Sequence, residues 1–477
     1  MQPHPKSPTD ERLFRALARQ GLVVTRDGPF VSVRSAEVPD APPAEILLPA
    51  ELPLEGRAAR QLADLAAVHH PDGGRACRAC ATPDVHPGDS GVAIGSVLET
   101  RDLLVPQAVG TDINCGMRLH VLDLELDRFL SRKDELVRRL RGDLLLGTRD
   151  VGANADAMRA MFTEGVPAFL EAASRDPVGS LAKMDLGAAY DEVDAIFEQG
   201  SLPGDAAFAP QTLVQGEGVI RDDGLATVGR GNHFVELQVV EEVVDRHKAW
   251  EAGLRPGRVV LLIHSGSRMV GKIIGKGAVE RARAAWPAGA RFPGSGLFPL
   301  SWASRPDLCE DYLRAEATAA NYAFVNRQLL AELVRLRVRE VWGELDAPLV
   351  ADIPHNLTFR EGAGWVARKG ACPAHDGQWV LIPGSMGTAS YVCVGRGAER
   401  TLQSASHGAG RAVRRQDTAR MSDPGLDGVD CQTLRPERLL QEAPAAYKPI
   451  GPVIDVQVAA GSIGVVARTR PLLTFKG

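Results

Sequence analysis

The sequence has 477 residues, of which 44% are hydrophobic and 24% are charged, close to the averages for soluble globular proteins. Its 55 lysines and arginines against 60 acidic residues give a formal charge of −5, which excludes a histone-like mode of nucleic-acid binding but leaves room for a local basic groove. No apolar run approaches the ~18 residues of a membrane-spanning helix, and the polar N-terminus lacks the apolar stretch of a secretory signal. We therefore expect a cytoplasmic protein without a membrane partner.

Short apolar and helical patterns predict a mixture of strands and helices. Strands are predicted at 21–33, 117–124, 233–240, 258–264, 378–382, 389–394 and 452–468. Helices are predicted at 131–141, where Ser131 with an acidic residue three positions later forms a capping box, and at 306–342, where apolar residues recur at helical spacing. Because the strands and helices follow no regular βαβ order, we predict an α+β fold with mixed or antiparallel sheets flanked by helices.

Seven cysteines, an odd number, favour free thiols over a disulfide framework. The pair Cys77 and Cys80 is a lone Cys-x-x-Cys without a second pair at zinc-finger spacing, and we interpret it as incidental.

Two glycine-bounded turns precede predicted strands and carry candidate metal ligands. Asp112 and Cys115 lie three residues apart in the turn 110–118, where a carboxylate and a thiolate could face one site; an Asx turn beside a buried cysteine is the alternative. His233 lies in the turn 229–236, and a surface histidine in a hairpin turn is the alternative there.

Four further segments place polar groups among small residues. His264 and Arg268 follow an apolar strand, as an oxyanion or phosphate site requires, although a polar loop is the more common explanation for such a segment taken alone. The segment 352–361 contains His355, and 383–391 is a loop of glycines and hydroxyls that could cradle phosphates. In 406–411, His407 is followed by three very small residues, which would leave its ring open to a bulky phosphate; a flexible surface loop is the favoured alternative for this segment taken alone.

Together these turns hold four of the eleven histidines and one Asp-x-x-Cys pair. Three imidazoles, one carboxylate and one thiolate are a possible ligand set for a transition-metal site, and a bridging Cys115 could hold two ions. Ligand softness alone would not select manganese, because one thiolate with imidazoles fits zinc or cobalt equally well.

With these segments in this order, the chain resembles the RtcB-type RNA ligase family over nearly its whole length, from Pro83 to Gly477. The motifs that carry the resemblance are Asp-Ile-Asn-Cys-Gly, Gly-Asn-His-Phe, His-Ser-Gly-Ser-Arg, Pro-Gly-Ser-Met-Gly-Thr and Ser-His-Gly-Ala-Gly-Arg. It implies a GTP-dependent ligase that joins an RNA 3′-phosphate or 2′,3′-cyclic phosphate to a 5′-hydroxyl through a covalent histidine–GMP intermediate.

The resemblance also implies residue roles. Cys115 would bridge two manganese ions, one completed by His233 and His264 and the other by Asp112 and His355, and His407 would be the nucleophile. The positions that match GTP contacts are Asn232, Phe234, Glu236, Asn356, Ser385, Ser390, Gly408, Ala409, Tyr447 and Lys476, with Glu236 and Lys476 reading guanine. Arg268, Arg411 and Arg415 would hold RNA phosphate, and Asp84 and His86 would support the metal-binding turn.

Three departures from the family pattern concern RNA docking rather than the ligands or the nucleophile. Ala367 stands where relatives usually carry histidine, Met-Val-Gly follows Arg268 in place of Gly-Leu-Gly, and Arg230 stands where relatives often have serine. They suggest a specialised paralogue. An archease-type activating partner is compatible with the resemblance, and we expect a monomer.

Because the implied site residues span Asp112 to Lys476, we predict one composite catalytic domain over 1–477, with a more variable portion at 1–75 and a motif-bearing core at 76–477. Two other functions stay open: a two-metal phosphoesterase that acts on RNA ends without ligation, and a non-catalytic RNA-binding protein. The scarcity of aromatic residues, 5%, and the absence of strong positive charge count against the latter.

Overall fold

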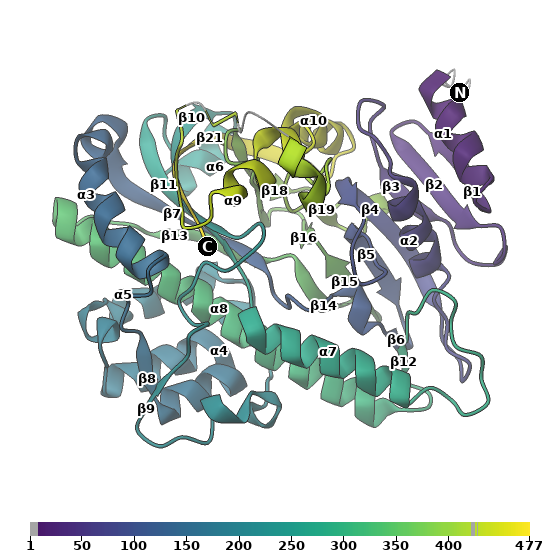
Figure 1. Cartoon of the computed structure of the whole chain (residues 1–477), viewed down its shortest axis with the longest axis horizontal. Coiled ribbons are helices and arrows are strands. Elements are labelled where there is room, and N and C mark those ends of the chain that lie inside the picture. Colours follow the sequence, from purple (N-terminus) through teal and green to yellow (C-terminus); the bar gives the residue numbers. More distant parts are fainter. Residues whose placement is uncertain (1–7, 421–424, 427) are drawn as a thin grey trace.

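Two β-sheets and one long helix that contacts both make up the framework of the computed structural model, which describes residues 8–420, 425–426 and 428–477 (Figure 1). The first sheet runs in the order β1 (Leu22–Asp27), β2 (Phe30–Ser35), β3 (Ala44–Leu47), β4 (Ala76–His86), β5 (Ile94–Thr100), β15 (Gly364–Lys369) and β14 (Asn356–Glu361). The second runs in the order β13 (Leu349–Pro354), β7 (Gly116–Glu125), β11 (Arg258–Ser265), β10 (Phe234–Val243), β21 (Ile463–Lys476), β18 (Ser390–Gly395) and β17 (Trp379–Ile382), with β20 (Asp430–Thr433) beside β21. Apart from the parallel pairs β3–β4 and β20–β21, the strands of these two sheets pair antiparallel.

Helices and three short strand pairs cover these sheets. The helices are α1 (Pro8–Ala18), α2 (Gly56–Ala66), α3 (Leu126–Leu144), α4 (Ala155–Arg175), α5 (Leu186–Asp191), α6 (Arg246–Glu251), α7 (Arg268–Ala284), α8 (Pro306–Trp342), α9 (Glu437–Gln441) and α10 (Ile450–Ala459). The short pairs join β6 (Leu103–Leu104) to β12 (Leu300–Ser301), β8 (Gly152–Asn154) to β9 (Val219–Arg221), and β16 (Ala371–Pro373) to β19 (Ser404–Ser406). This mixture confirms the predicted α+β class. Within the described ranges, no helix combines the length and apolarity needed to cross a bilayer.

The long helix α8 has the bounds that the sequence predicted and passes beneath both sheets in Figure 1. Pro306 occupies its first turn, where the missing N–H costs nothing, and Gly343 follows its last residue with a φ of 83°. The side chains of its middle section are buried against α3, α4 and α7 and against strands of both sheets. Packing on several sides explains why alanine recurs along α8 together with larger apolar residues.

The centre of the second sheet is buried on both faces. Along β11, Val259, Leu261 and Ile263 join an apolar cluster with residues of α3 and α8, whereas Val260 and Leu262 join a cluster on the other face. Alternate side chains of a strand point to opposite faces, so a continuous apolar run is what two buried faces require. The polar residues at the strand ends are then left for the site described below.

The other predicted strands are confirmed to within a few residues, except at the two ends of the chain. The single strand predicted at 21–33 is a hairpin of β1 and β2, which turns at Gly28 with a φ of 58°. The strand predicted at 452–468 is wrong in its first half, because the β-branched residues there form the buried face of α10, which ends before Gly461, with a φ of 69°. Packing has overridden local β propensity.

The capping box predicted at Ser131 is also wrong. Helix α3 begins at Leu126, five residues earlier, and Ser131 lies inside it with its hydroxyl donating to the backbone oxygen of Arg128. A serine inside a helix commonly makes such a local bond to a preceding carbonyl.

Candidate active site

The candidate site is built on the turn that leads into β7. In this turn the backbone N–H of Cys115 donates to the backbone oxygen of Asp112 at 3.0 Å, and Asn114 adopts a φ of 51°. The segment between β13 and β14 holds the turn from outside: His355 N–H donates to the Cys115 oxygen at 2.8 Å, and the Asn356 amide donates to the Asp112 oxygen at 3.0 Å. The turn is therefore fixed by the backbone N–H of His355 and by the side-chain amide of Asn356, the residue after it.

A fully buried guanidinium anchors the turn from below. Arg327 of α8 donates to the backbone oxygens of Asn114 and Ser265 at 2.7 and 3.0 Å and forms an ion pair with Asp352 at 2.7 Å. The turn before β7, the end of β11 and the strand β13, which directly precedes His355, are thus tied to one side chain. Truncating one partner of such a buried pair typically costs ~3–5 kcal/mol, so this anchor contributes strongly to the rigidity of the turn.

The remaining candidate ligands lie at the ends of neighbouring strands. His264 is near the end of β11, opposite Met117 of β7 and Phe234 of β10 in the antiparallel register. His233 directly precedes Phe234, so strand pairing alone brings His233, His264 and the residues before β7 to one edge of the second sheet.

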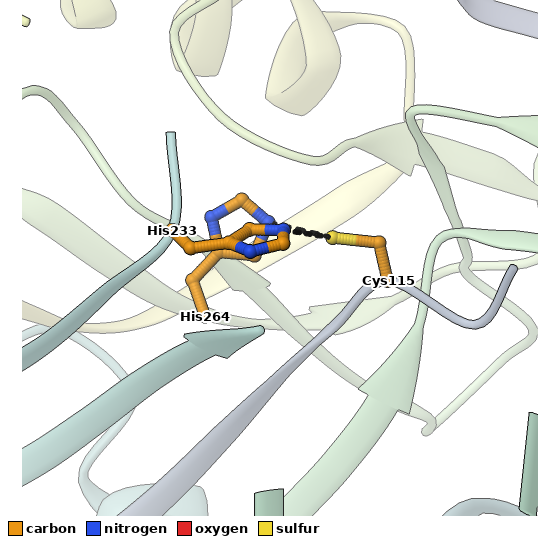
Figure 2. Close-up of side chains that lie close together, drawn as sticks. All are labelled: Cys115, His233 and His264. Atoms are coloured by element: carbon orange, nitrogen blue, oxygen red, sulfur yellow. Dashed lines mark hydrogen bonds between the residues drawn. The ribbon is translucent and has the colours of Figure 1, made fainter. Parts of the chain in front are cut away.

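Three of these side chains point at one another (Figure 2). The Sγ atom of Cys115 lies 3.2 Å from His233 Nε2 and 3.1 Å from His264 Nε2, and the ligand atoms of all three residues lie within 4.8 Å of one another. All three residues are buried. A thiol and two imidazoles gathered this closely are typical of a transition-metal site.

The tautomers support this interpretation. His264 Nδ1 lies 3.2 Å from the backbone oxygen of Asn232, and a carbonyl can only accept, so the ring proton belongs on Nδ1. Burial lowers the pKa of His264 well below its usual range, which leaves the ring neutral and puts a lone pair on Nε2. That lone pair faces the Cys115 sulfur and His355 Nε2, which is 3.3 Å away. A neutral imidazole lone pair aimed at a sulfur and a second imidazole in a buried site is the donor set that a transition metal takes, so the residues fit a metal.

Burial and the nearby Asp112 carboxylate raise the pKa of Cys115 well above its usual value. The thiol alone would therefore stay protonated at neutral pH. A divalent cation reverses this balance because it stabilises the thiolate directly.

The two other predicted ligands flank this cluster on different sides. Asp112 Oδ2 lies 2.9 Å from His233 Nε2, whereas His355 contacts His264. The predicted ligand set Cys115, His233 and His264 is thus brought together, and Asp112 and His355 each extend it by one contact. Burial also lowers the pKa of His355 well below its usual range, so this ring too is neutral and able to ligate.

His407 lies beside the cluster, at the end of β19, with its ring centroid 4.9 Å from that of His355. Its Nδ1 is 2.7 Å from Asp84 Oδ2, and its backbone N–H also faces that carboxylate at 3.3 Å. Burial disfavours the charge of Asp84, but the imidazole and the Thr82 hydroxyl outweigh this and lower the pKa of the carboxyl. An ionised acceptor on Nδ1 fixes the proton there and leaves a lone pair on His407 Nε2.

Asp84 and His86 were expected to support the metal-binding turn, and their contacts lie elsewhere. Asp84 contacts His407, and the ring of His86 stacks on His407 at 6.5 Å while its Nδ1 lies 2.9 Å from the Asp84 backbone oxygen. Burial lowers the pKa of His86 to about 3, so it packs as a neutral ring. Asp84 therefore orients the candidate nucleophile, and His86 packs beside the same ring.

A cavity of about 750 Å³ opens onto the ligand cluster and His407. Five of the predicted GTP contacts line it: Asn232, Asn356, Gly408, Ala409 and Tyr447. The other five, Phe234, Glu236, Ser385, Ser390 and Lys476, lie outside its lining. Some of these form a buried polar layer behind it: Gln238 links Glu236 to Ser390, Thr474 donates to Glu236, and the ammonium of Lys476 lies 5.7 Å from the Phe234 ring centroid.

Of the arginines predicted to hold RNA phosphate, Arg411 and Arg415 line the cavity and Arg268 does not. Arg268 donates instead to the Thr227 hydroxyl at 3.1 Å. Arg411 and Arg415 share the buried carboxylate of Glu442, which also accepts from the Tyr447 hydroxyl. Glu442 was missed in the sequence because no motif or periodic pattern surrounds it.

An α+β chain that sets a Cys–His–His cluster beside a carboxylate-oriented histidine defines a candidate metal-dependent phosphoryl-transfer site. Residues 61–477 match the family described as tRNA-splicing ligase RtcB. The tRNA-splicing ligase RtcB of Pyrobaculum aerophilum is 31% identical over 444 residues, covering 83% of this chain and 87% of the relative. That of Archaeoglobus fulgidus is 32% identical over 437 residues, covering 83% and 86%. The chain belongs to the RtcB family.

Proposed function

We propose that the protein is a GTP- and manganese-dependent RNA ligase that joins 3′-phosphate or 2′,3′-cyclic phosphate ends to 5′-hydroxyl ends. The observation that carries this proposal is the position of His407: its Nδ1 lies 2.7 Å from Asp84, its ring lies beside His355, and its Nε2 has no hydrogen-bond partner among the described residues. A phosphoesterase that relies on a metal-bound hydroxide has no use for such a nucleophile.

In the proposed first step, His407 Nε2 attacks the α-phosphorus of GTP. A P–N bond forms, the bond to the β-phosphate oxygen breaks, and pyrophosphate leaves. The positive charge that develops on the imidazole is stabilised by the ionised carboxylate of Asp84 through Nδ1–H, and the small residues Gly408 and Ala409 leave room for the phosphate.

In the later steps the RNA 3′-phosphate displaces His407 from the GMP phosphorus, so that the P–N bond breaks and an activated RNA forms. The 5′-hydroxyl then attacks the 3′-phosphorus, GMP leaves, and a 3′–5′ phosphodiester remains. A 2′,3′-cyclic end is first opened by water to the 3′-phosphate.

We assign the metal role to Cys115, His233 and His264, extended by Asp112 and His355, and propose manganese and two ions from the family resemblance. A bound divalent cation offsets the negative charge of the phosphates that would otherwise repel the nucleophile. Since the site draws on both sheets, we propose that the chain forms a single catalytic domain. We also propose that the protein acts as a monomer.

The test is to incubate the purified protein with an RNA carrying a 3′-phosphate, an RNA carrying a 5′-hydroxyl, α-labelled GTP and manganese. We expect a ligated product that requires both GTP and manganese, and an acid-labile labelled protein adduct. Hydrolysis of cyclic phosphate at an equal rate without GTP, and no joined product, would instead establish the phosphoesterase.

The proposed guanine contact makes GTP binding dependent on pH. Burial raises the pKa of Glu236 to about 7, so the free protein holds a proton at pH 6 that a carboxylate accepting from guanine N–H groups must lose. With a pKa of about 7, Glu236 is mostly protonated at pH 6 and mostly ionised at pH 8. Because only the ionised form can accept both guanine N–H groups, we expect the GTP affinity to be about tenfold higher at pH 8 than at pH 6. Calorimetry in buffers of different ionisation enthalpy measures the proton released.

Glu236→Gln supplies the control, since it cannot ionise. It should bind GTP weakly and with no pH dependence between 6 and 8. The same tenfold change in this variant would assign the effect to another group.

A further inference from the structure

The arginines that line the cavity fall into two groups. Arg411 and Arg415 are neutralised within the protein, because Arg411 Nη1 lies 3.4 Å and Arg415 Nε lies 3.1 Å from the buried carboxylate of Glu442. Arg411 also lies 5.1 Å from the Tyr447 ring centroid. These two side chains are held in place before any ligand arrives.

Arg230 and Arg414 are the contrasting pair. Both line the cavity and both are exposed. In the part of the chain that the structure describes, neither guanidinium has a hydrogen bond or an ion pair. A guanidinium carries five N–H donors, so both side chains offer unused donors to whatever enters the cavity.

Arg230 and Arg414 belong to two segments of the cavity lining that meet at Arg415. Arg230 stands between Gly229 and Gly231, whose φ values of 101° and 78° bend the turn before His233. A Cβ added at Gly231 would lie 3.5 Å from Arg415 Nη2, so this turn abuts Arg415, and Arg414 is its neighbour in the chain. The turn that carries Arg230 and the segment that carries Arg414 and Arg415 are therefore neighbours in the cavity lining.

The cavity lining carries an excess of positive charge, whereas the chain as a whole is negative. The protein carries a formal charge of −5, yet the cavity lining has six lysines and arginines against three carboxylates. A concentration of positive charge in the cleft of an acidic protein attracts a polyanion and focuses it there. Guanidinium groups grip phosphate oxygens in a bidentate manner, which makes a phosphate the matching ligand.

We propose that Arg230 and Arg414 form a phosphate-binding site on the rim of the cavity, which takes a backbone phosphodiester of the RNA next to the end being joined. The proposal rests on the proposed ligase function. The α-phosphate of the nucleotide must reach His407, whose side chain is only 12% exposed, whereas Arg230 and Arg414 are exposed on the solvent side, where an RNA strand enters. Arg230 also stands where relatives often have serine, so we expect this site to contribute to an RNA preference that is particular to this chain.

The test measures binding of a fluorescent single-stranded RNA with a 3′-phosphate to the full-length protein by anisotropy, over a range of salt concentrations. Arg230→Ser and Arg414→Ala should each weaken binding about tenfold, and each should reduce the slope of log affinity against log salt by about 0.7, the value for one lost phosphate contact on a single strand. Arg230→Lys and Arg414→Lys should keep most of the slope, because the charge remains.

Arg138→Ala is the matched control. Arg138 is exposed on α3, away from the cavity, and among the described residues its side chain makes no hydrogen bond or ion pair. Its removal changes the net charge by the same amount and should leave the RNA affinity and its salt slope unchanged. A loss equal to that of Arg230→Ser would reduce the effect to overall charge and overturn the rim site.

A second arm separates the two sources of phosphate. The KM for GTP is measured in adduct formation without RNA. Variants that raise this KM about tenfold and leave RNA binding unchanged would assign Arg230 and Arg414 to the nucleotide's own phosphates and overturn the proposal, as would variants that change neither. RNA binding needs no catalysis, so a wild-type protein that binds RNA through these arginines but forms no adduct would contradict the ligase function and support the rim site.

Discussion

His407→Ala is expected to abolish the covalent GMP adduct, and Asp84→Asn to slow adduct formation by about 10³–10⁴-fold. In the wild-type protein the Asp84 carboxylate accepts the Nδ1 proton of His407 at 2.7 Å. An asparagine amide offers a donor as readily as an acceptor, so the ring can adopt the tautomer with its proton on Nε2, which has no lone pair there to attack phosphorus. Replacing the buried aspartate of a serine-protease triad by asparagine has an effect of this size for the same reason.

The measurement is single-turnover labelling with α-labelled GTP, followed by mass spectrometry of the His407 peptide. Metal content is measured in parallel and should be unchanged in both variants, because Asp84 has no contact with the ligand cluster Cys115, His233 and His264. Asp89→Asn removes an exposed carboxylate that lines the same cavity and should react within a fewfold of the wild-type rate. An adduct that persists in His407→Ala would refute the nucleophile assignment, and a wild-type rate in Asp84→Asn would refute the tautomer argument.

The sequence located the candidate ligands because each lies in a turn of small residues next to a strand. Such a turn places its polar side chains at the end of a strand, beyond the apolar residues that the core covers. His233 and His264 are brought together by the pairing of β10 with β11, a consequence of strand order that local patterns did not contain. The sequence analysis inferred from the residue types alone that these ligands meet at one site. The distances from Cys115 to His233 and His264 show it directly.

Partners far apart in the chain were beyond the reach of the sequence. Asp84 and His407 are separated by 323 positions, and nothing in the segment around Asp84 indicates which imidazole it contacts. Glu442 is a similar case: it lies in an unpatterned segment, and only the folded chain shows that it neutralises Arg411 and Arg415. A charge that is satisfied internally and a charge that is free look the same in a sequence.

Local propensity also misled in one place with consequences for the site. The run of valines and isoleucines at 452–468 reads as a strand, but its first half is α10, which packs against β4 and β21. Gln457 of this helix accepts the backbone N–H of Ser406 at 2.8 Å, directly before His407. Helix α10 thus supports the segment that carries the candidate nucleophile.

Replacement of Cys115 by alanine is expected to remove the metal and with it all ligation. Its sulfur is the centre of the cluster, 3.2 and 3.1 Å from His233 Nε2 and His264 Nε2. Loss of an outer partner of a metal ligand typically costs 10–100-fold in affinity, so loss of the central ligand should cost about 100-fold or more. Cys115→Ser tests whether a hydroxyl suffices; we expect it not to, because a serine hydroxyl does not ionise as a thiol does.

Metal content is measured by elemental mass spectrometry after dialysis, and the metal-dependent rise in Tm is followed in parallel. A metal at 1,000 times its Kd stabilises the native state by ~4 kcal/mol, an increment that Cys115→Ala should lose. Cys309→Ala is the matched control, since Cys309 is an equally buried free thiol in α8 outside the cluster and should lower stability without changing metal content. Metal retained at wild-type affinity by Cys115→Ala would refute the central role of this sulfur.

The pH dependence of metal binding gives an independent test of the same thiol. The pKa of Cys115 is raised by burial and by Asp112, so the free protein holds the thiol proton throughout pH 6–8 and must release it when the metal binds. His264 and His355 have lowered pKa values, are already neutral in this range, and release nothing. The affinity contributed by Cys115 should therefore rise about tenfold per pH unit. Cys115→Ser should lose this tenfold step, and a variant that keeps it would show that the proton comes from another group.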